Sequence, residues 1–311
     1  MLIAPLVFAT QDGLSRYLAE KYSVTLTIIL RFWALAAGIS LYFFLFKKSR
    51  SLVFSKRPLL QILRSSILVA EIFVTVYSFT IVGLVATSAI FSSYPLLVVI
   101  FSYFILKEAL TKLKFGIVLV GFLGVLIIVK PGGDVFQMQS IIPFIGAVLF
   151  ALYGVLTRMA SFSDSSYTSL IWTGLIGAFF STLIAPFYII PIEKSDILLM
   201  SILCILGIVG HFVLIKAFEF AEAAVIQPFA YFHLVFAGII GVLIFNESIT
   251  WPIILGSSIV IIAGILSYLL DNTAKNLKNF VIAIANEFLI LVTINTPLLV
   301  FLRIDRHVYR Q

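Results

Sequence analysis

Long apolar runs, separated by short polar segments, dominate this chain. A helix that crosses a membrane needs about 20 mostly apolar residues. Ten segments meet this requirement, at approximately 1–19, 24–46, 60–80, 84–106, 113–130, 140–159, 166–190, 197–218, 222–245 and 251–270. The run from Ile117 to Leu123 shows no alternation of apolar and polar residues, which membrane barrels require. We therefore predict an all-α polytopic membrane protein with ten transmembrane helices.

Composition supports this interpretation. Of 311 residues, 62% are hydrophobic and 11% are charged, whereas a soluble domain carries about 25% charged residues. This excludes a soluble globular enzyme, a disordered chain and a secreted disulfide scaffold. The single cysteine, Cys204, permits neither an internal disulfide nor a cysteine metal cluster.

Basic residues are distributed unevenly over the predicted loops. The loops after the second, fourth and sixth helices contain nine lysines and arginines, at Lys47, Lys48, Arg50, Lys56, Arg57, Lys107, Lys112, Lys114 and Arg158. The opposite loops contain three, Lys21, Lys130 and Lys194. Because short basic loops favour the cytoplasm, the amino terminus is predicted to be cytoplasmic. The net charge of +7 then reflects topology, and no nucleic-acid partner is expected.

Both ends of the chain need separate interpretation. The first apolar run stops at Gln11 and follows no basic segment, which indicates a short or clipped helix and not a cleaved signal peptide. The segment from Phe280 to Leu302 is long enough to span. Crossing would place three arginines outside, against the charge rule. Residues 271–311 are therefore predicted to form a C-terminal extension whose helix either spans or lies at the interface.

The chain also repeats itself. Phe8, Leu14 and Arg16 are matched by Phe150, Leu156 and Arg158. The segments Glu108–Thr111 and Glu247–Thr250 match at nearly the same offset. These matches favour two homologous halves over chance similarity of apolar segments, at 1–130 and 140–270. Since each half has five helices, the second enters the membrane from the opposite face, which predicts an inverted repeat.

These residues resemble a known family. Nine short motifs occur in the order found in EamA-type transporters of the drug/metabolite transporter superfamily. They are Gln11–Leu18, Arg31–Phe32, Pro95, Lys107–Glu108, Gly121–Gly124, Lys130–Pro131, Gly210–Phe212, Lys216–Phe218 and Gln227–Phe229. The resemblance covers about residues 1–270. It implies ten helices and movement of a small metabolite across a bacterial inner membrane.

Ionisable residues within apolar helices are the first candidates for a site, because burying them in a membrane is costly. Asp12 and Arg31 lie at similar predicted depths in the first two helices and are expected to pair. Their pair would be either a gate or substrate contact, or a structural ion pair between helices. Glu71 lies near the middle of the third helix among apolar residues. It is expected to bind a proton or a cationic substrate group, or else to hydrogen-bond between helices.

The second half supplies further candidates. His211 lies at the repeat position of Glu71, and His233 is near mid-membrane. Each histidine is either a site residue or a packing residue, and two isolated histidines predict no metal site. Tyr94 and Gln227, beside Pro95 and Pro228, complete the substrate- or proton-binding set. Arg64, Glu108 and Glu247 are interpreted as helix-end groups.

No nucleotide-binding or catalytic motif is present in the sequence, so an enzyme is not expected. The predicted function is a secondary transporter that moves an amino-acid, nucleoside-like or vitamin-like metabolite by alternating access. A channel or lipid flippase of the same fold, and an intramembrane enzyme, are the alternatives. The expected partners are the substrate and membrane lipids, with a homodimer left open, and no cofactor or metal is expected.

Overall fold

The computed structural model describes residues 3–46, 50–108, 112–129, 139, 141–246 and 251–270. Glu247 and the predicted segment 280–302 lie outside these residues. The C-terminal part, 271–311, is a separate unit. The architecture below is that of the first unit, Met1–Leu270.

Each of the ten predicted segments contains helix, and the described residues include no strand. Eight segments hold one α-helix each: α1 (Ile3–Lys21), α2 (Val24–Phe46), α3 (Pro58–Ile81), α6 (Lys112–Val129), α7 (Ile141–Ser161), α8 (Ser166–Ile184), α9 (Ile197–Phe220) and α12 (Trp251–Leu270). The predicted end of the seventh segment, at 190, is wrong. Helix α8 ends at Ile184 and a 3-10 turn over Ala185–Phe187 follows, because Pro186 has no backbone N–H with which to continue the helical hydrogen bonds.

The other two segments are broken near their middles. One contains α4 (Leu84–Phe91), α5 (Tyr94–Phe101) and a π-helical turn over Ser102–Leu106. The other contains α10 (Ala223–Ala230) and α11 (Phe232–Phe245). Pro95 lies in the first turn of α5, where its missing N–H costs no helical hydrogen bond. Backbone hydrogen bonds continue across both breaks, among them Ser93 N–H to the Ile90 carbonyl at 3.1 Å and Leu234 N–H to the Tyr231 carbonyl at 3.1 Å.

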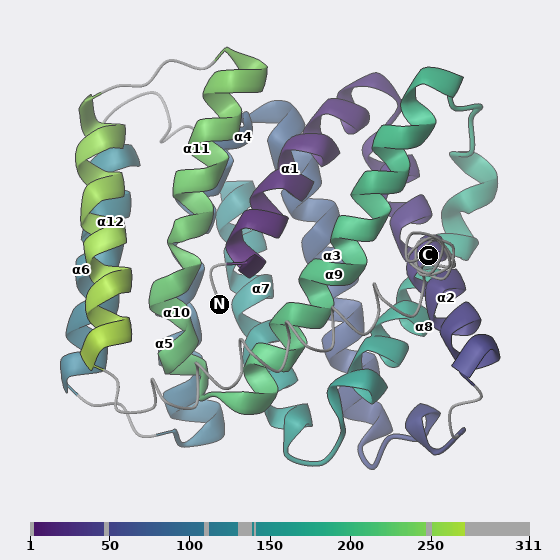
Figure 1. Cartoon of the computed structure of the whole chain (residues 1–311), viewed down its shortest axis with the longest axis horizontal. Coiled ribbons are helices and arrows are strands. Elements are labelled where there is room, and N and C mark those ends of the chain that lie inside the picture. Colours follow the sequence, from purple (N-terminus) through teal and green to yellow (C-terminus); the bar gives the residue numbers. More distant parts are fainter. Residues whose placement is uncertain are drawn as a thin grey trace, which may run out of the picture. The chain divides into compact units, whose positions relative to one another are not determined.

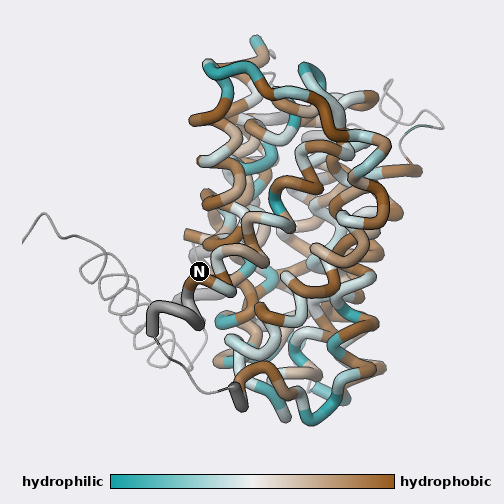
Figure 2. Tube along the Cα trace, turned by 90° about the vertical axis from the view of Figure 1, so that its right-hand side faces the viewer, coloured by the Kyte–Doolittle hydropathy of each residue, from teal (hydrophilic) through white to brown (hydrophobic). Residues whose placement is uncertain are grey.

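Within the described residues, six stretches of helix are long and apolar enough to cross a membrane: Val24–Leu41, Pro58–Ile81, Leu84–Leu106, Ile141–Ser161, Ser166–Phe187 and Lys194–Phe220. Three shorter apolar stretches accompany them: Phe115–Gly124, Phe232–Phe245 and Ile254–Ala263. Figure 2 shows hydrophilic residues gathered at both ends of the helices and mainly hydrophobic residues between them. This distribution suits a chain whose middle faces lipid.

Helices from the two halves of the sequence pack against one another (Figure 1). Helix α6 lies along α12, α3 along α7, and α2 along α8. Helix α1 contacts both α9 and α11, and α5 contacts both α7 and α10. Consequently α1, α3, α5, α7, α9 and the α10–α11 break surround the interior of the bundle.

Glycines allow helices to approach one another closely. A Cβ atom added to Gly124 would lie 2.8 Å from the carbonyl oxygen of Gly256, so α6 and α12 nearly touch through their backbones. A Cβ added to Gly121 would lie 2.4 Å from the ring of Tyr231, the residue at the α10–α11 break. These glycines therefore serve helix packing, as small residues commonly do in membranes.

Arg64 is not the helix-end group that its sequence position suggested. Its side chain is fully buried and donates hydrogen bonds to Gln61 Oε1 (2.6 Å), Thr157 Oγ1 (3.0 Å), Thr173 Oγ1 (2.8 Å) and the Ser169 carbonyl. Gln61 lies on the same helix, whereas Ser169, Thr157 and Thr173 come from α7 and α8, and the sequence around Arg64 gave no sign of these remote partners. Arg64 therefore stabilises the packing of α3 against two helices of the second half.

Candidate functional site

Six of the seven candidate residues line one cavity inside the bundle. These six are Asp12, Arg31, Glu71, Tyr94, His211 and His233. Apolar and aromatic side chains complete most of the wall, among them Phe8, Ile72, Phe91, Phe150, Leu214 and Ile226. The structure does not bring the seventh, Gln227, to the wall, although its neighbour Ile226 is there. Gln227 is buried, and its Nε2 donates to the Ala223 carbonyl at 3.0 Å.

Asp12 and Arg31 form no direct ion pair in the described part of the chain, although their charges interact. Asp12 instead pairs with His233, whose Nε2 lies 2.8 Å from Asp12 Oδ2. Packing of α1 against α11 brings the two residues together, and hydropathy along the chain carries no information about that packing. Arg31 lines the same cavity but has no hydrogen bond or ion pair to any residue in the described part of the chain.

Glu71 contributes a second carboxyl group to the cavity. It is 4% exposed, and its Oε1 accepts a hydrogen bond from Thr75 Oγ1 at 2.7 Å, one helical turn away. Thr75 itself lines the cavity. Glu71 is not bonded to a residue of another helix within the described ranges, so its carboxyl group is available to a bound molecule or a proton.

Three rings form an aromatic wall beside these charges. The centroid of Tyr94 lies 4.8 Å from that of Phe150, edge to face, and 5.2 Å from that of Phe91. Phe91 and Phe150 are 5.3 Å apart. Such contacts hold aromatic rings in fixed positions. They therefore give a planar ligand a preformed surface.

His211 and Gln11 present buried polar atoms without partners. Both ring nitrogens of His211 and the Oε1 atom of Gln11 lack a hydrogen-bond partner among the described residues. His211 is held between the rings of Phe8 and Tyr153, at centroid distances of 5.5 and 6.3 Å. Because a buried polar group without a partner is costly, these atoms at a cavity wall suit a ligand or ordered water. No group of three or more metal-binding side chains occurs in the described residues.

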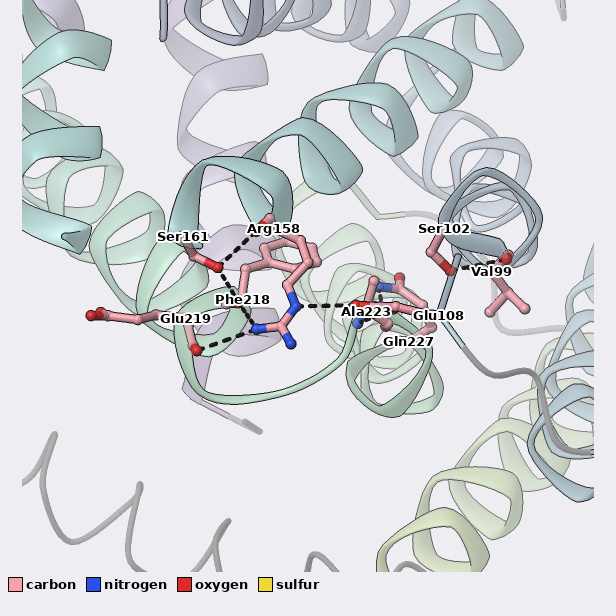
Figure 3. A network of polar contacts seen from close by, with 9 residues as sticks. All are labelled: Val99, Ser102, Glu108, Arg158, Ser161, Phe218, Glu219, Ala223 and Gln227. Carbon is pink, nitrogen blue, oxygen red and sulfur yellow. Dashed lines mark hydrogen bonds and ion pairs between the residues drawn. The ribbon is translucent and has the colours of Figure 1, made fainter. Parts of the chain in front are cut away.

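A polar network crosses between the two halves at one end of the bundle (Figure 3). Arg158, at the end of α7, donates from Nε to Glu108 Oε1 at 3.1 Å and from Nη1 to the Phe218 carbonyl at 2.8 Å. Glu108 Oε2 accepts the amide N–H of Ala223 at 3.0 Å, at the start of α10. The Arg158 network therefore joins the segment after α5 to α7, α9 and α10.

Sequence reasoning gave Glu108 no role beyond a helix end and gave Arg158 none. Both had nevertheless been noticed as charged residues at repeat-related positions, and this was the available signal. Burial raises the pKa of Glu108 despite the opposing effect of its hydrogen bond from Arg158. Glu222 is a near neighbour that raises it further.

A second network joins the halves at the opposite end. Lys21, the last residue of α1, contacts Glu193 Oε2 and Asp196 Oδ2, each at 2.7 Å. The Tyr22 hydroxyl donates to Asp196 at 2.7 Å. Hydrogen bonds from Lys21 and Tyr22 lower the pKa of Asp196, and the same bonds to Asp196 and Glu193 raise that of Lys21. The Lys21 network and the Arg158 network thus connect the two halves at both ends.

Comparison with known families matches residues 1–130 and 139–269 to the model of the EamA-like transporter family. The chain belongs to the EamA-like transporter family. As a member of that family with several apolar spans, it is a multi-pass membrane protein and a transporter.

Curated relatives of this EamA-like chain carry transporter names. The S-adenosylmethionine uptake transporter of Rickettsia felis is 25% identical over 239 residues, which are 77% of this chain and 81% of that protein. The S-adenosylmethionine uptake transporter of Rickettsia conorii is 24% identical over 87% of this chain and 92% of its own. The riboflavin transporter of Brucella anthropi is 26% identical over 64% of this chain and 75% of its own. These names support a small-molecule substrate and a transporter rather than an enzyme.

A solved crystal structure shares the fold. It superimposes with a TM-score of 0.66 over 86% of this chain and 96% of its own, at 18% sequence identity.

Proposed function

We propose that this EamA-like protein is a secondary transporter in which two inverted five-helix repeats, 1–130 and 140–270, move a small organic metabolite by alternating access. The cavity is the observation that carries the proposal. Asp12, Arg31 and Glu71 come from the first half, and His211 and His233 from the second. A site shared between two repeats near mid-membrane is the arrangement of many secondary transporters.

Matching contacts support the repeat. Helix α3 packs along α7 as α9 packs along α1, and α5 contacts α7 as α11 contacts α1. Both broken segments also end in a left-handed residue, Lys107 and Asn246. Their separation of 139 residues equals that between Glu108 and Glu247, which follow them in the sequence.

The two end networks are suited to act as gates. Each joins residues of the first half to residues of the second by short polar contacts. Opening one end while the other stays closed would break one network and leave the other intact, and water that enters would hydrate the separated groups. The Arg158 end is assigned to the cytoplasm because basic residues are concentrated there, which also makes the amino terminus cytoplasmic. The bacterial relatives favour the inner membrane.

The walls of the cavity indicate the kind of cargo. Carboxyl groups, a guanidinium and an aromatic wall suit a polar molecule with a planar ring, such as a nucleoside-like or vitamin-like metabolite. The names of the relatives, S-adenosylmethionine and riboflavin transporters, both describe such molecules.

Uptake of radiolabelled S-adenosylmethionine and riboflavin by liposomes that contain the purified protein tests this function. A carrier gives saturable uptake that is accelerated when unlabelled substrate is loaded inside. Flux that does not saturate would instead indicate a channel. Movement of labelled lipid between the leaflets would indicate a flippase, and product formation without net movement of substrate would indicate an enzyme. Any of these three results would contradict the proposal.

A further inference from the structure

Arg31 is a buried cation with no direct ion-pair partner in the described part of the chain, although the carboxyl groups of Asp12 and Glu71 in the same cavity interact with its charge. Its side chain is 7% exposed, it lines the cavity, and in the described part of the chain it neither donates a hydrogen bond nor forms an ion pair. A guanidinium has five N–H donors and stays charged in proteins. Burying it without a partner is costly, so a binding role accounts for its position better than a structural one does.

The surroundings of Arg31 leave its polar edge open. Asp12, the aspartate in the lining of the cavity, has His233 as its direct partner. Across from Arg31 on α9 lies Gly207, where a Cβ atom would stand 3.6 Å from Arg31 Nε and 3.4 Å from Gln11 Oε1. A side chain longer than that of alanine at this position would cover both polar groups. Gln11 Oε1 lacks a hydrogen-bond partner among the described residues, and it faces the same small space beside Gly207 as the Arg31 guanidinium does.

The cavity also contains the complementary charge. Glu71 accepts one hydrogen bond from Thr75 and has no partner on another helix in the described ranges. Asp12 lies nearby in the same wall, and the rings of Tyr94 and Phe150 stand beside these groups. The wall therefore offers a place for an anionic group, a place for a cationic group and a flat apolar surface.

We infer that Arg31 binds a carboxylate of the transported molecule while Glu71 receives its cationic group, so that the substrates are zwitterionic metabolites that carry a planar ring. This inference rests on the proposed transport function and narrows it. A planar guanidinium binds a carboxylate through two parallel hydrogen bonds, which the point charge of lysine does not reproduce. Riboflavin has no carboxylate and falls outside the inferred class, whereas S-adenosylmethionine falls within it.

Binding of matched ligand pairs to the purified protein tests the role of Arg31. The pairs are S-adenosylmethionine with its decarboxylated form and L-tryptophan with tryptamine, and riboflavin is tested alongside. We expect the carboxylate-bearing member of at least one pair to bind about 10- to 100-fold more tightly, the range for a hydrogen bond to a charged group. Arg31→Gln should abolish that difference and leave the affinity for the decarboxylated form within about 2-fold, since only the carboxylate contact is lost.

Two further variants separate recognition from folding. Arg31→Lys should fold as the wild type does and restore only part of the selectivity. Arg57→Gln, at an exposed arginine outside the cavity, should leave every affinity unchanged. Elution as a single species in size-exclusion chromatography checks that each variant is folded.

The inference is overturned if both members of each pair bind equally, if none binds, or if Arg31→Gln weakens both members alike. The inference also fails if riboflavin is transported and Arg31→Gln leaves riboflavin uptake unchanged. That result would still support the proposed transport function. Carboxylate-selective binding without saturable exchange in liposomes would have the opposite meaning. It would support the binding role of Arg31 and contradict the proposed transport function.

Discussion

The Nε2 atom of His233 lies 2.8 Å from Oδ2 of Asp12, although 221 residues separate them in the chain. This contact ties the first helix to the break between α10 and α11, on the wall of the cavity. It also gives Asp12 a direct partner other than Arg31, whose charge Asp12 attracts without a hydrogen bond. One pair thus connects the two halves at the wall of the cavity.

Substituting either member of this pair should show their coupling. We expect Asp12→Asn and His233→Ala each to lower the free energy of unfolding by about 1.5–3 kcal/mol, the range for a hydrogen bond to a charged group. The double variant should lose little more than the larger single loss, because the same contact is removed in each case. Unfolding in detergent, followed by circular dichroism, measures this cycle. Fully additive losses would show that the two residues do not stabilise each other.

Breaking the Arg158 network should open that end of the bundle. In a Cys204→Ala background, a cysteine at Leu214, which lines the cavity, reports access for a membrane-impermeant maleimide. We expect Arg158→Gln to speed labelling from the Arg158 side about 10-fold. This change corresponds to a loss of about 1.4 kcal/mol in the free energy that favours the closed over the open state of this end. Arg57→Gln, an exposed arginine at the same end, is the control. Equal labelling rates in both variants would remove the gating role of Arg158.

The Lys21 network should depend on pH in a defined direction. Hydrogen bonds from Lys21 and Tyr22 lower the pKa of Asp196 in the folded protein. The stabilisation by the Asp196 carboxylate is therefore fully present above the usual aspartate pKa of about 3.9. It is lost as the pH falls through the lower pKa that Asp196 has in the folded protein. We expect the melting temperatures of the wild type and Asp196→Asn to differ by a constant amount between about pH 5 and 7 and to converge below about pH 4. A difference that grows on acidification would contradict this account.

The approach of α6 to α12 gives a prediction about packing. A Cβ at Gly124 would lie 2.8 Å from the Gly256 carbonyl oxygen, whereas one at Gly116 on the same helix would meet nothing within 4 Å. Gly124→Val should therefore cost about 1–3 kcal/mol of stability through overpacking, and Gly116→Ala should cost none. Thermal unfolding of the two variants measures the difference. Similar melting temperatures would mean that α6 and α12 are less closely packed than described.

Much of the fold could be predicted from the sequence, because apolar length alone determines where a chain can cross a membrane. The predicted segments 24–46 and 251–270 agree closely with α2 and α12. Pro95 and Pro228 lie within the two broken segments, but the helices stop at other residues, Phe91 and Ala230. Hydropathy describes one dimension, so it located Glu71 and His233 without revealing which helices face one another.

The errors have the same origin. Asp12 was assigned to Arg31 because both were at similar depths on neighbouring helices, yet α1 also packs against α11, which supplies His233. Arg64 was placed at a helix end because the local sequence did not reveal its buried role. Its partners Thr157 and Thr173 lie on α7 and α8, which are remote in the sequence. Which polar side chains satisfy one another depends on helix rotation and packing, and a single sequence contains little information about either.

The most direct test of the central claim is substrate uptake by Glu71→Gln in liposomes. The substitution preserves the size of the side chain and removes the carboxyl charge from the cavity. Glu20→Gln, at the end of α1 and outside the cavity, is the matched control. The account predicts that Glu71→Gln reduces saturable uptake at least about 10-fold, as expected for the loss of a charged contact, and alters its pH dependence, while Glu20→Gln behaves as the wild type does. Uptake by Glu71→Gln with unchanged rate and unchanged pH profile would contradict it.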